Sequence, residues 1–287
     1  MQTERAAFVE RLRTRITALF DAKDAPPSPD VESLLADFLE ALNQGIIRAA
    51  EPDDQGNWYV HSWVKKGILL CFRYGVLTDR TPPQSPFHFF DKHTLPLHPF
   101  SLQDRVRIVP GGSAIRSGTY VAPGVICMPP MYINIGAYVD EETMVDSHVL
   151  VGTCAQIGKR VHLSAGVQIG GVLEPPNAQP VIIEDDVFIG ALSGVFEGVR
   201  VRRRAVIASG VLLTNSTPVY DTVQQRILRG SDQQPLEIPP NAVVVAGSRP
   251  LQSPFARQHQ LAVYTPVIVK YRDARTDAKT ILEQTLR

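Results

Sequence analysis

Aliphatic residues recur at every sixth position through the middle of the chain, from Val109 to Val219. A helix repeats every 3.6 residues and a half-buried strand every 2 residues, so neither element sustains this period. The period is typical of a hexapeptide repeat, in which three six-residue sides close one coil of a parallel β-helix. We predict that the recurring side chains point into the coil and stack on equivalents about 18 residues away. These positions are Val109, Ile115, Val121, Cys127, Ile133, Val139, Val145, Val151, Ile157, Leu163 and Ile169, then Ile183, Ile189, Val195, Val201, Ile207, Leu213 and Val219.

The repeat is interrupted twice. The count slips across the Pro-rich segment Leu173–Pro180, and a polar loop follows Val219 over Tyr220–Pro235. One further coil is predicted beyond the loop, because Ile238 and Val244 are again six residues apart.

Before the repeat, the hydrophobic spacing changes to that of amphipathic helices. Residues 1–24 follow this spacing, and Asp30 is placed to cap a second helix after a Pro-rich break. The segments Ile46–Arg48 and Trp58–His61 alternate like a short hairpin, and Trp63–Arg73 predicts a third helix. The first hundred residues are therefore expected to be rich in α-helix.

After the repeat, Leu261–Tyr271 alternates like a strand, and a final helix is predicted from Thr276 to Leu286. An exposed coil end would offer unpaired backbone groups to other chains, so a capping segment is physically expected there. The predicted division is an α-rich domain and arm over 1–100, the parallel β-helix over 101–250, and a strand and helix cap over 251–287.

Composition excludes several functional classes. Lysine plus arginine equals aspartate plus glutamate at 29 each, which argues against the basic surface of a nucleic-acid-binding protein. No apolar run approaches the roughly 20 residues needed to span a bilayer, and the N-terminus lacks a signal-peptide core. The cysteines Cys71, Cys127 and Cys154 are expected to be reduced, buried thiols of a cytoplasmic protein. No cysteine–histidine spacing or phosphate loop predicts a metal or nucleotide site.

Several long motifs resemble the signature of tetrahydrodipicolinate N-succinyltransferases, enzymes of the lysine and diaminopimelate pathway. They are YINIGAYVDEETMVDSHVLVGTCAQIGKRVHLSAGVQIGG from Tyr132, VIIEDDVFIGA from Val181, NWYVHSWVKKGILLCFR from Asn57, and the short RIVP, FFDK and VIVK segments that begin at Arg107, Phe89 and Val267. The resemblance covers nearly the whole chain from about Gly45, in the same order. It implies a left-handed parallel β-helix, a homotrimer, and transfer of a succinyl group from succinyl-CoA to an amino diacid.

The resemblance also assigns roles to two charged residues. Asp146, in the motif MVD, matches the acidic residue at the reacting centre, where a carboxylate could accept or orient the proton of the acceptor amine. Arg107 matches a position that contacts the diacid, and a guanidinium can hold a carboxylate through two hydrogen bonds. Asp140 also follows an inward valine, but the family motif favours Asp146.

Binding of CoA is implied for a further group of residues. Its anionic phosphates need cations, and its thin pantetheine arm suits small side chains and backbone amides. The candidates are Lys159, His162, Ala191, Ala208, Ser209 and Arg249, with Lys270 and the run Arg202–Arg204 as further basic positions. His162 could be structural instead, and an arginine run is more often a solvated face.

The chain departs from the family at one motif. The common form reads GARSE after FIG, whereas this chain has Leu192 and Gly194 in place of that arginine and glutamate. Loss of both charges suggests a changed acceptor or acyl group. We therefore predict an acyl-CoA-dependent N-acyltransferase, with an acetyl-CoA or specialised, tabtoxin-like enzyme and a non-catalytic hexapeptide scaffold as the alternatives.

Overall fold

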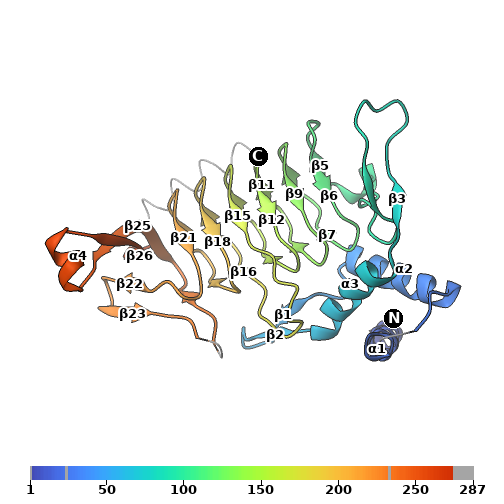
Figure 1. The fold of residues 1–287 in the computed structure, drawn as a ribbon, viewed down its shortest axis with the longest axis horizontal. Coiled ribbons are helices and arrows are strands. Elements are labelled where there is room, and N and C mark those ends of the chain that lie inside the picture. Colours follow the sequence, from blue (N-terminus) through green and yellow to red (C-terminus); the bar gives the residue numbers. More distant parts are fainter. Residues whose placement is uncertain (1, 23–24, 232–233, 274–287) are drawn as a thin grey trace.

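The computed structural model describes residues 2–22, 25–231 and 234–273. Its dominant feature is a long stack of coils made from very short strands, with helices beside one end (Figure 1). Successive strands visit three sheets in turn, and each strand pairs in parallel with the strand one coil further along. The prediction of a mainly β fold built from parallel strands is confirmed.

Each face of the coil is named here after its first strand. The β5 face contains β5 (Arg107–Ile108), β8 (Ile126–Cys127), β11 (Met144–Val145), β14 (His162–Leu163), β17 (Phe188–Ile189) and β20 (Val206–Ile207). The β6 face contains β6 (Ala114–Ile115), β9 (Tyr132–Ile133), β12 (Leu150–Val151), β15 (Gln168–Ile169), β18 (Gly194–Val195) and β21 (Leu212–Leu213). The β7 face contains β7 (Tyr120–Val121), β10 (Tyr138–Val139), β13 (Gln156–Ile157), β16 (Ile182–Ile183), β19 (Arg200–Val201) and β24 (Glu237–Ile238). The chain turns at three corners, called β5/β6, β6/β7 and β7/β5.

The second residue of each short strand fills the coil. On the β7 face Val139, Ile157 and Ile183 stack in register with no exposed surface. Burial of one such aliphatic side chain contributes about 1.5–3 kcal/mol to the free energy of folding. The stacked side chains form the larger of the two hydrophobic clusters among the described residues. The predicted start was wrong by one residue, because Ile108 and not Val109 lies opposite Cys127.

Both interruptions of the repeat leave the coil at the β6/β7 corner. The first separates Ile157 from its register partner Ile183 by 26 residues. The second follows β21 and contains an antiparallel hairpin of β22 (Val219–Asp221) and β23 (Arg226–Leu228). The segment predicted as a polar loop is therefore partly β-structure.

The N-terminal helices are α1 (Gln2–Asp21), α2 (Pro29–Asn43) and α3 (Ser62–Tyr74), which confirms the three predicted helices. The cap of α2 is Ser28 and not Asp30, since Pro29 suits the first helical position and moves the cap to the residue before it. The first hairpin pairs β1 (Ala50–Pro52) with β2 (Trp58–Val60), so its first strand lies beyond the predicted Ile46–Arg48. A second hairpin joins β3 (Leu77–Asp79) to β4 (Phe90–Lys92), and the 3-10 helix η1 (Leu102–Asp104) leads into the coil.

The N-terminal segment packs against the coil through an apolar cluster that includes Ile135 and Cys154, and through polar contacts on the β7 face. The guanidinium of Arg48 lies 3.6 Å from the centre of the Tyr138 ring, and its Nε donates to Gln156 Oε1 at 3.1 Å. The indole N–H of Trp58 donates to Glu184 at 3.1 Å. These contacts leave the β5/β6 corner, on the opposite side of the triangle, uncovered by the helices.

The C-terminal segment extends the β5 face past the last coil. Strand β25 (Ala242–Pro250) pairs in parallel with β20 on one side and antiparallel with β26 (Ala262–Tyr271) on the other. The short helix α4 (Pro254–Gln258) connects β25 to β26. The predicted strand Leu261–Tyr271 is confirmed. The predicted helix Thr276–Leu286 lies outside the described residues.

Candidate functional site

Asp146 lies at the β5/β6 corner, directly after β11. Its backbone N–H donates to the carbonyl of Leu163 at 3.0 Å, which ties the residue to the next coil. Its Oδ1 accepts the backbone N–H of Ser147 at 2.7 Å. The Ser147 N–H holds the carboxylate in one orientation. Because Asp146 is only half-buried, the carboxylate still reaches solvent.

The same corner brings together most of the small residues predicted to line CoA. Asp146 is the first residue after β11, and the first residues after the next three strands of the β5 face lie at the same corner in successive coils. These are Ser164 after β14, Gly190 after β17 and Ala208 after β20. Corner-to-corner hydrogen bonds connect these coils, including Leu192 N–H to the Ala165 carbonyl at 3.0 Å and Gly210 N–H to the Ala191 carbonyl at 2.9 Å. Strands stack about 4.8 Å apart, so Ala191 lies roughly 10 Å and Ala208 roughly 15 Å along the edge from Asp146. Ser209 is the next residue and is exposed.

Arg107 and His162 lie on the β5 face instead. Arg107 is exposed and occupies the outward position that Met144 holds two coils later. It is therefore about 10 Å along the axis from the coil of Asp146. The half-buried His162 ring stacks on Phe188 with centroids 4.9 Å apart.

Lys159 belongs to a different corner. Its Nζ forms an ion pair with Glu141 at 2.9 Å, and this hydrogen bond raises the pKa of the lysine. It lines a polar cavity of about 520 Å³ at the β7/β5 corner, together with Arg48, Trp58 and Asp140. Lys159 and Asp140 are therefore separated from Asp146 within one chain.

The remaining basic candidates are spread along the C-terminal half. Arg249 lies on β25 opposite Val263, beyond the last coil. Arg202 is engaged by two carboxylates, at 2.7 Å from Glu184 and 3.1 Å from Glu237. Its charge is therefore already neutralised within the chain, which favours a structural role for it over CoA binding.

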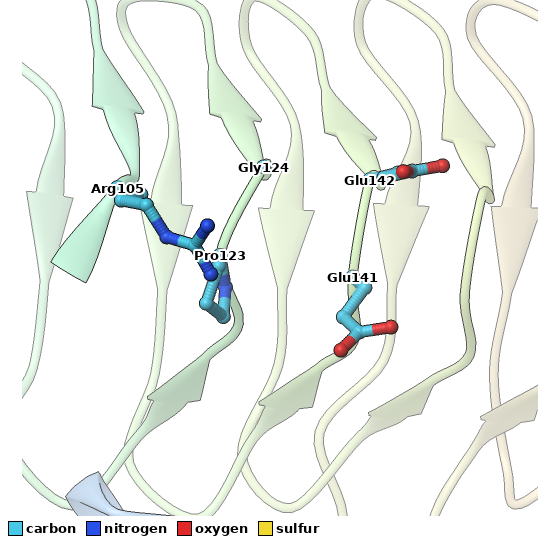
Figure 2. A pocket seen from close by; sticks show the side chains of 5 residues that line it. All are labelled: Arg105, Pro123, Gly124, Glu141 and Glu142. Atoms are coloured by element: carbon cyan, nitrogen blue, oxygen red, sulfur yellow. The ribbon is translucent and has the colours of Figure 1, made fainter.

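A small cavity of about 390 Å³ lies between successive turns of the β7/β5 corner. Figure 2 shows its five lining residues, with the Arg105 side chain extended beside Pro123 and the carboxylates of Glu141 and Glu142 pointing in different directions. None of the residues predicted to bind substrate or CoA lines this cavity.

The departure from the family motif has a local structural counterpart. Leu192 is 74% exposed at the β5/β6 corner, and its Cδ2 would lie 2.8 Å from a Cβ added at Gly166. Gly194 is buried, and the ring of Phe196 occupies the space that a side chain at 194 would need. Two coils along from Asp146, the chain is thus uncharged at the two positions where the motif of the resembled family carries an arginine and a glutamate. Sequence reasoning missed Phe196, although an aromatic residue two positions after an outward glycine was a usable signal.

Membrane-spanning helices and clustered metal ligands are both absent from residues 2–22, 25–231 and 234–273. None of the helices in these ranges is long and apolar enough to cross a membrane. No group of three or more histidine, cysteine, aspartate or glutamate side chains in this part of the chain could hold a metal ion.

Comparisons with known proteins identify similar chains over nearly the full length. Residues 11–74 match the family model of the tetrahydrodipicolinate N-succinyltransferase N-terminal region, and residues 180–215 match that of the hexapeptide repeat of succinyl-transferase. A 2,3,4,5-tetrahydropyridine-2,6-dicarboxylate N-succinyltransferase of Acinetobacter baylyi is 44% identical over 275 residues, which is 94% of each chain. The enzyme of that name from Dechloromonas aromatica is 41% identical over 98% of this chain and 97% of its own. A solved Campylobacter jejuni structure, described as a tetrahydropyridine-2-carboxylate N-succinyltransferase, is 16% identical, with a TM-score of 0.45 over 85% of this chain and 63% of that chain.

Proposed function

Because the chain belongs to the tetrahydrodipicolinate N-succinyltransferase family, we propose that it transfers the succinyl group of succinyl-CoA to the nitrogen of tetrahydrodipicolinate, which becomes an amine when water adds to the cyclic imine and opens the ring to the amino diacid. The observation that carries this proposal is 41–44% identity to enzymes of that name over more than nine-tenths of the chain. Such a reaction belongs to lysine and diaminopimelate biosynthesis.

In the proposed reaction, Asp146 acts on the acceptor amine. The amine is protonated in water and must lose a proton before its lone pair can attack the thioester carbonyl. Asp146 accepts or orients that proton and the new C–N bond forms. The C–S bond then breaks with its electron pair on sulfur, and the sulfur takes up the proton lost by the acylated nitrogen, so that CoA leaves as its thiol. The half-buried position of the carboxylate, fixed by the Ser147 N–H, suits this role.

Arg107 is proposed to hold one carboxylate of the diacid. A guanidinium presents paired N–H donors that match a carboxylate, which fixes the substrate as well as attracting it. Backbone N–H groups at the β5/β6 corner are suitable donors for the oxyanion of the tetrahedral intermediate.

The pantetheine arm of CoA is proposed to run along the β5/β6 corner beside Ala191, Ala208 and Ser209, with Arg249 near the phosphates. His162 is proposed to line the CoA site from the adjoining β5 face. Lys159 lies at another corner, so a role for it in CoA binding requires a neighbouring chain to face this corner. We accordingly propose a homotrimer of left-handed coils packed side by side, with the site between two subunits.

Three broader assignments accompany this function. We propose a cytoplasmic location for the protein. We also propose the division into an α-rich domain over 1–100, a β-helix over 101–250 and a cap over 251–287. The packing of Arg48 and Trp58 on the β7 face supports a fixed position of the first part on the second.

A second candidate function is N-acylation of a related amino diacid in a specialised pathway, with either a succinyl or an acetyl donor. The exposed Leu192 and the Gly194 that Phe196 covers favour it, since an acceptor there meets neither an arginine nor a glutamate.

Thiol release from succinyl-CoA and from acetyl-CoA, each measured with and without tetrahydrodipicolinate, tests both candidates. Release that needs succinyl-CoA and tetrahydrodipicolinate together supports the main proposal. Release only with another diacid or with acetyl-CoA supports the second candidate, and no release with any amino diacid supports the scaffold.

A further inference from the structure

The two interruptions of the repeat meet at one cavity of about 590 Å³. The first interruption contributes Gln179, and the second contributes Ile227, Leu228 and Arg229. Arg200 and Glu237, from neighbouring strands of the β7 face, line the same cavity. In repeat proteins, insertions into an otherwise regular coil frequently build a binding surface.

Arg200 is the most deeply buried charged group in this wall. Only 8% of its side chain is exposed, and its Nη1 forms an ion pair with Glu237 Oε1 at 2.6 Å. Its Nε is also buried and has no hydrogen-bond partner among the described residues. A buried N–H donor without a partner destabilises a fold by about 1–3 kcal/mol, so this atom calls for an explanation.

Gln179 presents a matching acceptor. Its Oε1 is buried and likewise makes no hydrogen bond within the described part of the chain. Two residues that line one cavity, from two different segments, therefore each carry a buried polar atom without a partner, a donor on Arg200 and an acceptor on Gln179. A ligand that accepts a hydrogen bond at one atom and donates one at another would satisfy both.

The charge of the wall indicates the sign of this ligand. Arg200 and Arg229 contribute two positive charges, whereas Glu237 contributes one negative charge and shares it with Arg202 at 3.1 Å. The excess is positive, which favours an anion. Ile227, which is 50% exposed, and Leu228 provide an apolar side for a hydrocarbon stem.

We propose that this cavity binds a small organic carboxylate that carries a hydroxyl or amino donor next to the carboxylate and a short aliphatic stem. On binding, the side chains of Arg200 and Gln179 turn these buried atoms toward the ligand. The carboxylate accepts from Arg200 Nε and from the Arg229 guanidinium, the donor group binds Gln179 Oε1, and the stem packs on Ile227 and Leu228. Arg200 and Glu237 belong to the β7 face, which lies across the coil from the β5/β6 corner and Asp146. Within one chain, this site is therefore separate from the corner that holds Asp146.

A matched pair of acids tests the proposal on the full-length protein. The probes are 2-hydroxy-4-methylpentanoate and 4-methylpentanoate, which differ only in the hydroxyl, with inorganic phosphate as a third probe; binding is measured by ligand-observed NMR without acyl-CoA. The hydroxy acid should bind roughly five-fold more tightly than its partner, as expected for one added hydrogen bond. Arg229→Gln should weaken binding of both acids roughly ten-fold, and Gln179→Leu should abolish the preference for the hydroxyl.

The charge-matched control is Arg257→Gln on α4, which should bind both acids as the unaltered chain does. Arg229 is exposed, so its loss leaves the Arg200–Glu237 pair and the fold intact even where Arg200→Gln would not. Three outcomes would overturn the proposal: equal affinity for the two acids, binding of phosphate alone, and no binding of any probe. If no probe binds, Arg200 and Gln179 need no organic ligand as a hydrogen-bond partner. None of these outcomes bears on thiol release, so failure here is distinguishable from failure of the proposed function.

Discussion

The aromatic ring of Phe196 lies where a side chain at Gly194 would have to be. The same ring covers Gly170 on the preceding coil, where an added Cβ would lie 2.9 Å from Phe196 Cδ1. A glutamate at position 194 would therefore clash with Phe196, whose ring packs on Gly170 and Gly194 of the β6 face. The Phe196 ring therefore fills the β6 face at the position where the resembled motif has a glutamate.

This packing predicts the effect of restoring the family glutamate. Gly194→Glu should lower the free energy of unfolding by about 1–3 kcal/mol, because the new side chain must displace Phe196. Urea unfolding of Gly194→Glu, Phe196→Ala and the double variant measures the coupling between the two positions. The glutamate should destabilise much less in the Phe196→Ala background, and an equal loss in both backgrounds would contradict the steric explanation.

Asp146 has a well-matched control in the same chain. Both Asp140 and Asp146 follow an inward valine, and each accepts the next backbone N–H, at 2.8 Å and 2.7 Å. Asp146→Asn should lower kcat by about 100-fold or more, the range expected for a group that moves or orients a proton. Asp140→Asn should retain normal turnover, since Asp140 lies at another corner, and thermal unfolding should show both variants folded. Equal kcat values for the two variants would remove Asp146 from the mechanism.

Arg107 should act on acceptor binding and not on CoA binding. Arg107→Lys keeps the charge but loses the paired donors, so KM for the diacid should rise roughly ten-fold while KM for acyl-CoA stays constant. Steady-state kinetics with each substrate varied in turn separates the two constants. A parallel rise in both KM values would indicate a general distortion of the β5 face instead.

The sequence predicted the coil well because a period of six follows directly from its geometry. The period alone assigns Val139, Ile157 and Ile183 to the core, since each must face the axis, and the three side chains are stacked there. The first coil was harder to place, as seven positions separate Ile108 from Ile115 and shift the register by one.

The candidate site was predictable only in part. The spacing of the repeat places Asp146 and Ser164 at one corner, but the fit of Phe196 over Gly170 and Gly194 depends on side-chain packing that a period does not encode. For the same reason, the sequence could not predict that Gln179 and Arg229 line one cavity, because both lie on insertions that do not follow the repeat.

Adjacent leucines test the assignment of inward and outward positions. Leu213 is fully buried in the coil, whereas Leu212 points outward and is 46% exposed. Leu213→Ala should lower the free energy of unfolding by about 2–5 kcal/mol, and Leu212→Ala by less than about 1 kcal/mol. Urea unfolding of the two variants gives the comparison, and similar losses would mean that the strand is not oriented as described.

The three cysteines predict how stability changes at alkaline pH. Burial raises the pKa of the Cys71, Cys127 and Cys154 thiols to about 12, whereas an unfolded thiol has a pKa of about 8.5. Native thiols should therefore react with a disulfide reagent only after denaturation. Between about pH 9 and pH 12 the unfolded chain loses thiol protons that the native chain retains, so these groups make stability fall as pH rises.

Each thiol contributes a slope of about 1.4 kcal/mol per pH unit over that interval. Cys127→Ala removes one such group from the coil interior, so its unfolding free energy should decline less steeply than that of the unaltered chain between about pH 9 and pH 10.5. Urea unfolding at several pH values measures both slopes, and other titrating groups cancel in their difference. Identical slopes would show that Cys127 ionises alike in both states, which its complete burial in the aliphatic stack opposes.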